Sequence, residues 1–160
     1  MLDVRQPTCA SDMTDHQEQI HLDIARIGWH VVKVLEGAEA DEPPFAYTVG
    51  LTRSFGHPEL MIVGLDLDDM HAVLNDLGDL VKAGRVFAPM DEIPEILEGC
   101  PCRIAPVAQH RLDMWVGQAL EYYGSVDVTL LQCLWPDRNG HFPGDSDFDV
   151  RLSLLQPLLC

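Results

Sequence analysis

Apolar positions recur along this chain with helical spacing in three places. The first stretch begins with a capping box at Thr14. This stretch ends before Gly28. The second follows Asp66, whose carboxylate suits a helix N-terminus, and ends at Gly84, and the third covers residues 110–123. Their apolar stripes are Ile20, Ile24 and Ile27; Met70, Val73, Leu74, Leu77, Leu80 and Val81; and Leu112, Trp115, Val116, Ala119, Leu120 and Tyr123. The pattern predicts three helices.

Runs rich in β-branched and aromatic residues lie between and after these helices. They predict five strands, at residues 29–35, 45–51, 60–65, 102–107 and 126–135. The first two are joined by an acidic loop and are expected to pair antiparallel, and residues 86–99, with two prolines, are expected to form a loop or one short turn.

The order of these elements predicts an α+β fold, a mixed, mostly antiparallel sheet of about five strands with three helices packed on it. Residues 1–13 are expected to be a flexible lead-in and residues 14–160 a single α+β domain. Within it, the leucines of the tail between Leu152 and Leu159 are expected to dock on an apolar surface.

Composition and charge favour a globular protein and disfavour membrane or nucleic-acid binding. A chain of 160 residues, 47% of them apolar, can bury a core of its own. It has no apolar run of bilayer length and no signal peptide, so a cytoplasmic location with no membrane contact is expected. With 26 acids against 10 bases, the net charge of −16 disfavours DNA or RNA and favours a partner with a basic surface, although solubility alone would also account for it.

The five cysteines indicate neither a disulfide framework nor a complete zinc site. Cys100 and Cys102 form one tight pair, but no second pair follows at zinc-finger spacing. They are expected to be two half-buried thiols entering a strand, and no cofactor is indicated by the sequence.

Candidate chemistry concentrates between residues 45 and 60, where Tyr47, Thr48, His57 and Glu59 stand among strand-like segments. Strand alternation places Tyr47 and Thr48 on opposite faces. His57 precedes a proline and is expected on a turn, as a general base oriented by Glu59 or as a histidine bonded to backbone. A metal set of His57, Glu59 and His30 is a further possibility that no spacing demands.

A second group, Gln132, Trp135 and Asp137, lies where the last predicted strand ends. Trp135 is expected to be core or the floor of a pocket, and Asp137 to form the turn before Gly140. Phosphate-binding loops, dinucleotide fingerprints, nucleophile elbows and zinc-protease helices are all missing from the sequence, which disfavours those standard enzyme designs.

Several motifs together resemble a known family. They are Gly28-Trp29, Phe45-Ala-Tyr-Thr-Val-Gly-Leu51, Phe55-Gly-His-Pro-Glu-Leu60, Gly64-Leu65, Leu74-Asn75, Tyr123-Gly124, Leu131-Gln132, Trp135-Pro-Asp137 and Phe142-Pro143. In this order, over about residues 20–143, they resemble the bacterial family called domain of unknown function 4262, and that resemblance implies no activity. The family usually continues Phe-Pro with Trp and an acid, whereas this chain has Gly144-Asp145. A much weaker likeness is to the suppressor-of-fused family, which acts by protein binding.

Two hypotheses follow. The first is a binding or accessory domain that engages a protein or peptide through a pocket near Tyr47, His57 and Trp135, with Thr48, Gln132 and Asp137 as further ligand-binding residues. The second is a small enzyme in which His57 and Glu59 are catalytic, with or without His30 and a divalent metal.

Overall fold

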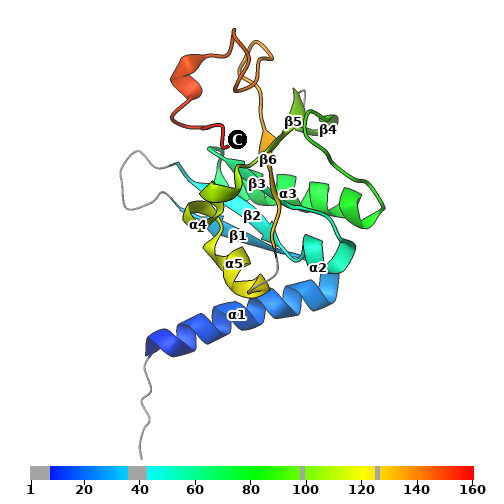
Figure 1. The fold of residues 1–160 in the computed structure, drawn as a ribbon, viewed down its shortest axis with the longest axis vertical. Coiled ribbons are helices and arrows are strands. Elements are labelled where there is room, and N and C mark those ends of the chain that lie inside the picture. The colour runs from blue at the N-terminus through cyan, green and yellow to red at the C-terminus, as the bar shows by residue number, and fades with distance from the viewer. Residues whose placement is uncertain (1–7, 36–42, 98–99, 125–126) are drawn as a thin grey trace, which may run out of the picture.

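The computed structural model is built around one six-stranded sheet (Figure 1). It describes residues 8–35, 43–97, 100–124 and 127–160, with side chains from Asp15 onward except those of residues 16 and 95. The strands are β1 (His30–Val34), β2 (Phe45–Val49), β3 (Glu59–Val63), β4 (Glu92–Leu97), β5 (Cys100–Pro106) and β6 (Leu130–Leu134). The helices are α1 (Thr8–Ile27), α2 (Leu51–Phe55), α3 (Leu67–Lys82), α4 (Leu112–Trp115) and α5 (Gly117–Tyr123), with 3-10 turns at Gln109–Arg111 and Val150–Leu152. The predicted α+β class is confirmed, with more helices and one more strand than expected.

The strands lie in the order β1-β2-β3-β6-β5-β4. All neighbours are antiparallel except β3 and β6, which run parallel with Met61 opposite Gln132. The predicted antiparallel pairing of the first two strands is confirmed, with Val32 opposite Tyr47. Because β3 and β6 are far apart in the sequence, their pairing joins an N-terminal and a C-terminal group of strands into one sheet.

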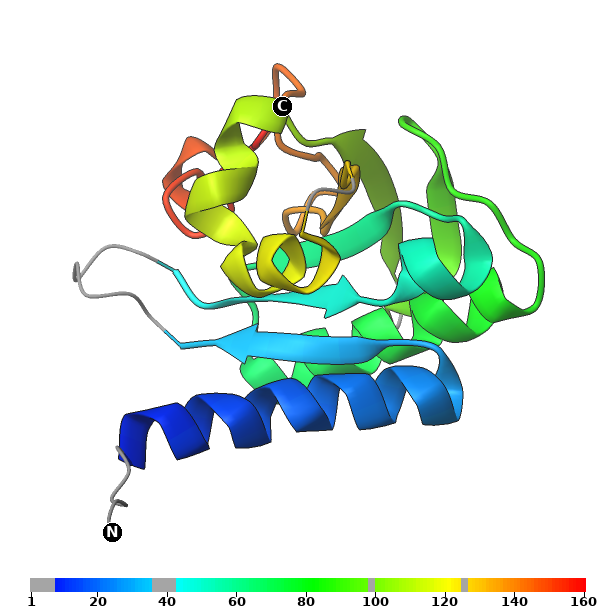
Figure 2. The same cartoon turned by 60° about the horizontal axis from the view of Figure 1, so that its bottom comes forward.

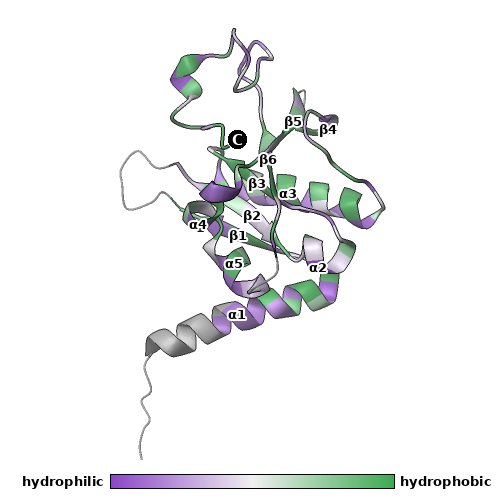
Figure 3. Ribbon diagram, in the orientation of Figure 1, coloured by the Kyte–Doolittle hydropathy of each residue, from purple (hydrophilic) through white to green (hydrophobic). Residues whose placement is uncertain are grey.

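Each face of the sheet has its own hydrophobic core, and α3 covers one of them. The core under α3 contains Trp29, Leu60, Ile62 and Leu74. On the other face, α4, α5 and part of α1 pack over Tyr47, Val49, Met61 and Val63 (Figure 2). Hydrophobic residues run through the central strands, whereas much of the described part of α1 is hydrophilic (Figure 3). The alternation of side chains along β2 and β3 thus supplies both cores.

Helix α2 was not predicted, and residues 50 and 51 were wrongly placed in a strand. The strand ends because Gly50 has φ 121°, a left-handed conformation in which a Cβ would lie 2.7 Å from the carbonyl oxygen of Gly28. The chain then turns into α2, which ends at Gly56. This short helix lies between the two motifs that carry most of the candidate chemistry.

Three further expectations about the elements were wrong. Residues 92–97 form β4, because Pro94 lies on a strand at the edge of the sheet, where a missing N–H is tolerated. The helix expected over 110–123 is interrupted at Val116, because its φ of −124° and ψ of 50° are not helical. The Val116 side chain is buried, and α5 starts at Gly117. Helix α1 begins at Thr8 rather than Thr14, since no proline or glycine follows Pro7 until Gly28.

Some expectations fall on residues outside the description. These are the start of the flexible lead-in, residues 1–7, and most of the acidic loop, residues 36–42. The side chain of Thr14, on which the capping box depends, is also among them. Within the described part of the chain, no helix combines the length and apolarity needed to span a bilayer.

Candidate functional site

The carboxylate of Glu59 lies at the centre of the region where the two motifs meet. Its side chain is fully buried at the start of β3, beside the N-terminus of α2. Oε1 accepts hydrogen bonds from Thr48 Oγ1 at 2.8 Å and Leu51 N at 3.2 Å. Oε2 accepts from Gly50 N at 3.2 Å, from Thr52 N at 3.0 Å and from the Tyr123 hydroxyl. All five partners donate, which suits the ionised carboxylate, a group that only accepts.

Two hydroxyl groups complete this network. Thr48 Oγ1 accepts from Leu60 N at 2.9 Å, which leaves its own hydrogen for Glu59. The Tyr123 hydroxyl accepts from the backbone N–H groups of Gly50 and Arg53 and donates to Glu59. Burial raises the pKa of Tyr123 well above its ordinary value, and the neighbouring Glu59 raises it further. The hydrogen bonds of Glu59 therefore link β2, α2, β3 and α5, and the two hydroxyl groups in the network stay protonated.

His57 is 3% exposed and has a hydrogen-bond partner at each ring nitrogen. Nδ1 lies 2.7 Å from the carbonyl oxygen of Pro58, and Nε2 lies 2.9 Å from the backbone nitrogen of Phe87. A carbonyl only accepts and a backbone N–H only donates, so these partners assign the neutral tautomer with its proton on Nδ1. To act as a general base, His57 would have to release Phe87. The catalytic roles given to His57 and Glu59 stay predictions, and both side chains are occupied within the fold.

Tyr47 and Thr48 lie on opposite faces of β2, as the alternation predicts. Tyr47 is buried in the core under α5, where its hydroxyl accepts from Gln118 N at 3.1 Å. Burial raises the pKa of Tyr47 to about 12. The two residues therefore do not line one pocket together.

On β6, the strand next to β3, Gln132 holds the C-terminal segment against the sheet. Its Nε2 donates to the Pro157 carbonyl at 2.8 Å, and its Oε1 accepts from Leu159 N at 3.1 Å. Gln156, which the sequence did not single out, exchanges two hydrogen bonds of 2.9 Å with the backbone of Trp135. The docking expected of the leucine-rich tail is met only in part, because Leu159 is buried whereas Leu154 and Leu155 are exposed.

Asp137 organises the loop that follows β6. Its carboxylate accepts from the backbone N–H groups of Asn139, His141 and Asp149, each at 2.9 Å. Burial alone would raise the pKa of Asp137, but these donors outweigh it and hold the pKa below its usual range. This geometry agrees with a turn former, and the ligand-binding role of Asp137 stays a prediction.

His30 is oriented by Asp23 rather than by the motif residues. Its Nδ1 lies 2.6 Å from Asp23 Oδ2. Among the described side chains, no three His, Cys, Asp or Glu are grouped so that they could hold a metal ion. His30, His57 and Glu59 therefore do not form the metal set considered from the sequence.

Trp135 is the predicted ligand residue that lines a surface pocket. The pocket has a volume of about 410 Å³ and lies between α3 and the β4–β5 hairpin. The Trp135 indole donates to the Val63 carbonyl at 2.7 Å, and 8% of the residue is exposed. Asp69 and Asp76 of α3 also line the pocket, and we call it the α3 groove. The sequence contained both acids, but nothing in it singled them out as binding residues.

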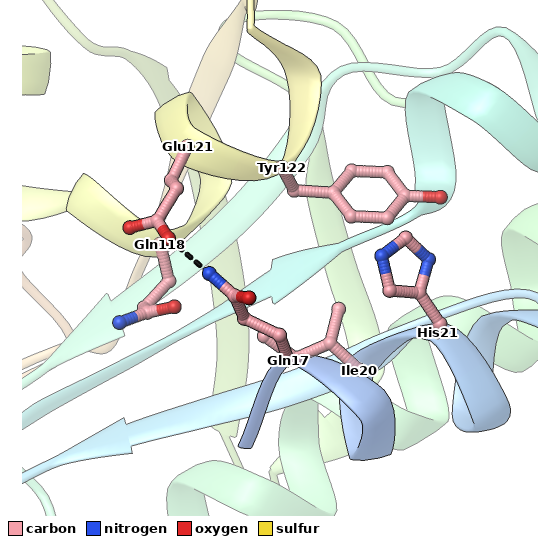
Figure 4. Close-up of a pocket in the computed structure, with 6 residues that line it drawn as sticks. All are labelled: Gln17, Ile20, His21, Gln118, Glu121 and Tyr122. Atoms are coloured by element: carbon pink, nitrogen blue, oxygen red, sulfur yellow. Dashed lines mark hydrogen bonds between the residues drawn. The ribbon is translucent and has the colours of Figure 1, made fainter. Parts of the chain in front are cut away.

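A second pocket, of about 200 Å³, lies between α1 and α5 (Figure 4). Gln17 Nε2 donates to the Glu121 carboxylate across it, and the rings of His21 and Tyr122 lie 5.1 Å apart. Four of the side chains that line this pocket therefore bond or pack against each other in pairs.

The sequence profile of the family Domain of unknown function (DUF4262) matches residues 23–149. The chain belongs to this family. No curated protein and no solved structure matches the chain. The DUF4262 match covers both motifs, the Glu59 network, the α3 groove and the Asp137 loop, so the site belongs to the family's own domain.

Proposed function

We propose that this DUF4262 protein is a binding domain that engages a protein or peptide partner. The observation that supports this best is how the conspicuous motif residues are used. The polar side-chain atoms of Glu59 and His57 all make hydrogen bonds within the fold. The α3 groove, in contrast, opens to solvent beside Trp135 and carries acidic side chains. The motifs build the scaffold, and the surface does the binding.

The alternative is a small enzyme that uses His57 and Glu59 for acid–base chemistry. It requires both side chains to leave buried hydrogen bonds, at a cost of about 1–3 kcal/mol for each group left unsatisfied. Enzymes do position such groups in buried networks, but they leave one atom directed at the substrate. The geometry of His57 supports this alternative less well than the binding role.

A peptide-display selection with the full-length chain as bait tests the proposal. A folded protein of similar acidity serves as the parallel bait, because a net charge of −16 recruits basic peptides without specificity. We expect a shared sequence pattern enriched on this chain alone, with dissociation constants of about 1–100 μM for the resynthesised peptides. Selection of the same peptides on both baits, or of none on this one, would contradict a binding function.

Native and denaturing mass spectra of the protein, purified without chelators, test the alternative directly. A stoichiometric excess mass in the native spectrum that disappears in a folded His57→Ala variant would favour the enzyme. If His57 serves the scaffold alone, neither protein is expected to carry an excess mass over its own sequence mass in the native spectrum.

A further inference from the structure

We propose that the α3 groove binds an extended peptide segment in which an apolar side chain is flanked by lysine or arginine. This inference rests on the proposed binding function and names its site and the chemistry of the partner. It follows from the shape of the groove, its unpaired acids and their spacing along α3.

The groove has an apolar base and a polar rim. Val73 and Trp135 are almost buried and form the base, whereas Asp69, Ala72 and Asp76 are exposed on the helix side. Ile96, Leu97 and Cys100 form the opposite wall and are half-buried. A volume of about 410 Å³ falls within the range of ligand-binding pockets, about 300–1,000 Å³. The base therefore accommodates an apolar side chain of a partner.

The charge of the groove has one sign. Asp69 and Asp76 are its ionisable carboxylates, and no lysine, arginine or histidine lines it. Within the described part of the chain, neither carboxylate makes an ion pair. The solvent side of α3 adds Asp68 and Asp79, so a cationic partner meets an extended negative surface there. Charge complementarity selects lysine or arginine on either side of the apolar residue.

The spacing of the two acids sets the pattern expected in the partner. Asp69 and Asp76 are two helical turns apart, which is roughly 10 Å along the axis, with Ala72 between them. In an extended peptide, every second side chain points the same way at about 3.3 Å per residue. Basic residues four positions apart are then about 13 Å apart, and their long side chains can converge on the two carboxylates. The apolar residue midway between them faces Ala72 and the base of the groove.

Other pockets of the described structure fit this role less well. The pocket of Figure 4 carries Glu121, which is already bonded to Gln17. The pocket between α1 and α3 carries Asp23, which is paired with Arg26 and His30. A third, beside Phe45 and Trp115, has no charged lining residue and so nothing to select a partner by charge.

Fluorescence anisotropy with labelled synthetic peptides tests the inference. The probe carries basic residues four positions apart with leucine midway, in a glycine and serine background. A second peptide replaces the leucine with glycine, and a third replaces both basic residues with glutamate. We expect the probe to bind, each altered peptide to bind at least about fivefold more weakly, and binding to weaken as sodium chloride is raised from low to physiological concentration.

Two isosteric double variants locate the site. Asp69→Asn with Asp76→Asn removes the groove carboxylates, and Glu18→Gln with Asp113→Asn removes the same charge from exposed positions on α1 and α4, outside the groove and away from α3. The groove variant is expected to weaken the probe roughly five- to tenfold, and the control less than twofold. Ala72→Trp, an exposed substitution that fills the groove, is expected to abolish binding. Circular dichroism confirms that each variant is folded.

The outcomes separate this inference from the proposed function. Equal weakening by both double variants, or full binding to Ala72→Trp, would overturn the α3 groove as the site. Peptides that bind the chain specifically but carry no basic residues would overturn the partner chemistry and leave the binding function standing. If neither this probe nor any selected peptide binds, the binding function itself fails.

Discussion

Replacing Glu59 with glutamine tests the central hydrogen-bond network. The amide keeps one acceptor oxygen and replaces the other with an NH2 group, which can only donate. Oε2 serves three donors and Oε1 two, so the amide oxygen is expected to take the Oε2 position. The NH2 group then faces the hydroxyl of Thr48 and the N–H of Leu51. Two buried donors lose their acceptor.

The size of the effect follows from these two lost interactions. A hydrogen bond to a charged group contributes about 1.5–3 kcal/mol, so the free energy of unfolding should fall by about 3–6 kcal/mol. That is a large share of the roughly 5–15 kcal/mol typical of a folded protein. A loss of this size corresponds to a drop in melting temperature of roughly 6–24 °C for a chain of this length.

Urea unfolding followed by far-UV circular dichroism measures this loss. Glu18→Gln makes the same chemical change at an exposed position of α1 and is expected to shift stability by less than about 0.5 kcal/mol. Equal dependence on urea for the wild type and both variants confirms that the same two states are compared. A loss of less than about 1 kcal/mol for Glu59→Gln would show that the network does not depend on the carboxylate, and the reasoning would be refuted.

Three further predictions concern other parts of the fold. Gly78→Ala places a Cβ 2.5 Å from Trp29 Cε2 and is expected to lower the unfolding free energy by about 1–3 kcal/mol in the same urea assay. Gly117→Ala is the control, because a Cβ at Gly117 meets no atom within 4 Å, and it is expected to be neutral or slightly stabilising. An unfolded tyrosine ionises near pH 10, while burial raises the pKa of Tyr47 to about 12 and also raises that of Tyr123, so stability should hold up to about pH 9 and fall as pH rises through 10 to 12. A single tyrosinate transition with its midpoint near pH 10 for all three tyrosines of the folded protein would contradict this. Gln156→Ala leaves the Trp135 N–H and C=O without their partner, so it is expected to lower the free energy of unfolding by about 2–4 kcal/mol and to speed amide exchange at Trp135. Unchanged exchange at Trp135 would argue against the contact.

The sequence predicted the class of fold because hydrophobic periodicity is a local property. Strands β1, β2 and β3 and helix α3 follow directly from the spacing of their apolar residues. Strand β4 was missed because Pro94 signals a break unless the strand is known to lie at the edge of a sheet, and edge position depends on the order of strands. Helix α2 was missed for a related reason. Its first turn is capped by Glu59, a residue that follows the helix in the sequence.

The sequence predicted where the candidate residues lie in the fold, whereas their functional roles stay predictions. His57, Glu59 and Thr48 were correctly recognised as unusual polar residues among core strands, yet their partners could not be read from the chain. Tyr123 comes from α5, and Phe87 follows α3, both distant in sequence. Whether a polar side chain serves the scaffold or a ligand depends on those partners. For the same reason, Asp69 and Asp76 were not singled out as binding residues, since nothing local placed them beside Trp135.

The parallel pairing of β3 with β6 has a consequence for how the chain folds. Everything from α3 to α5 lies between these two strands in the sequence, so the middle of the sheet can close only after a long loop has been ordered. Closing such a loop costs conformational entropy before the paired strands contribute any stabilisation, and proteins dominated by distant contacts fold slowly. The β1-β2-β3 meander, made of near neighbours, is free to form first. Until β6 pairs with it, β3 is an unpaired edge of this meander. At that stage the chain is most exposed to pairing with another molecule.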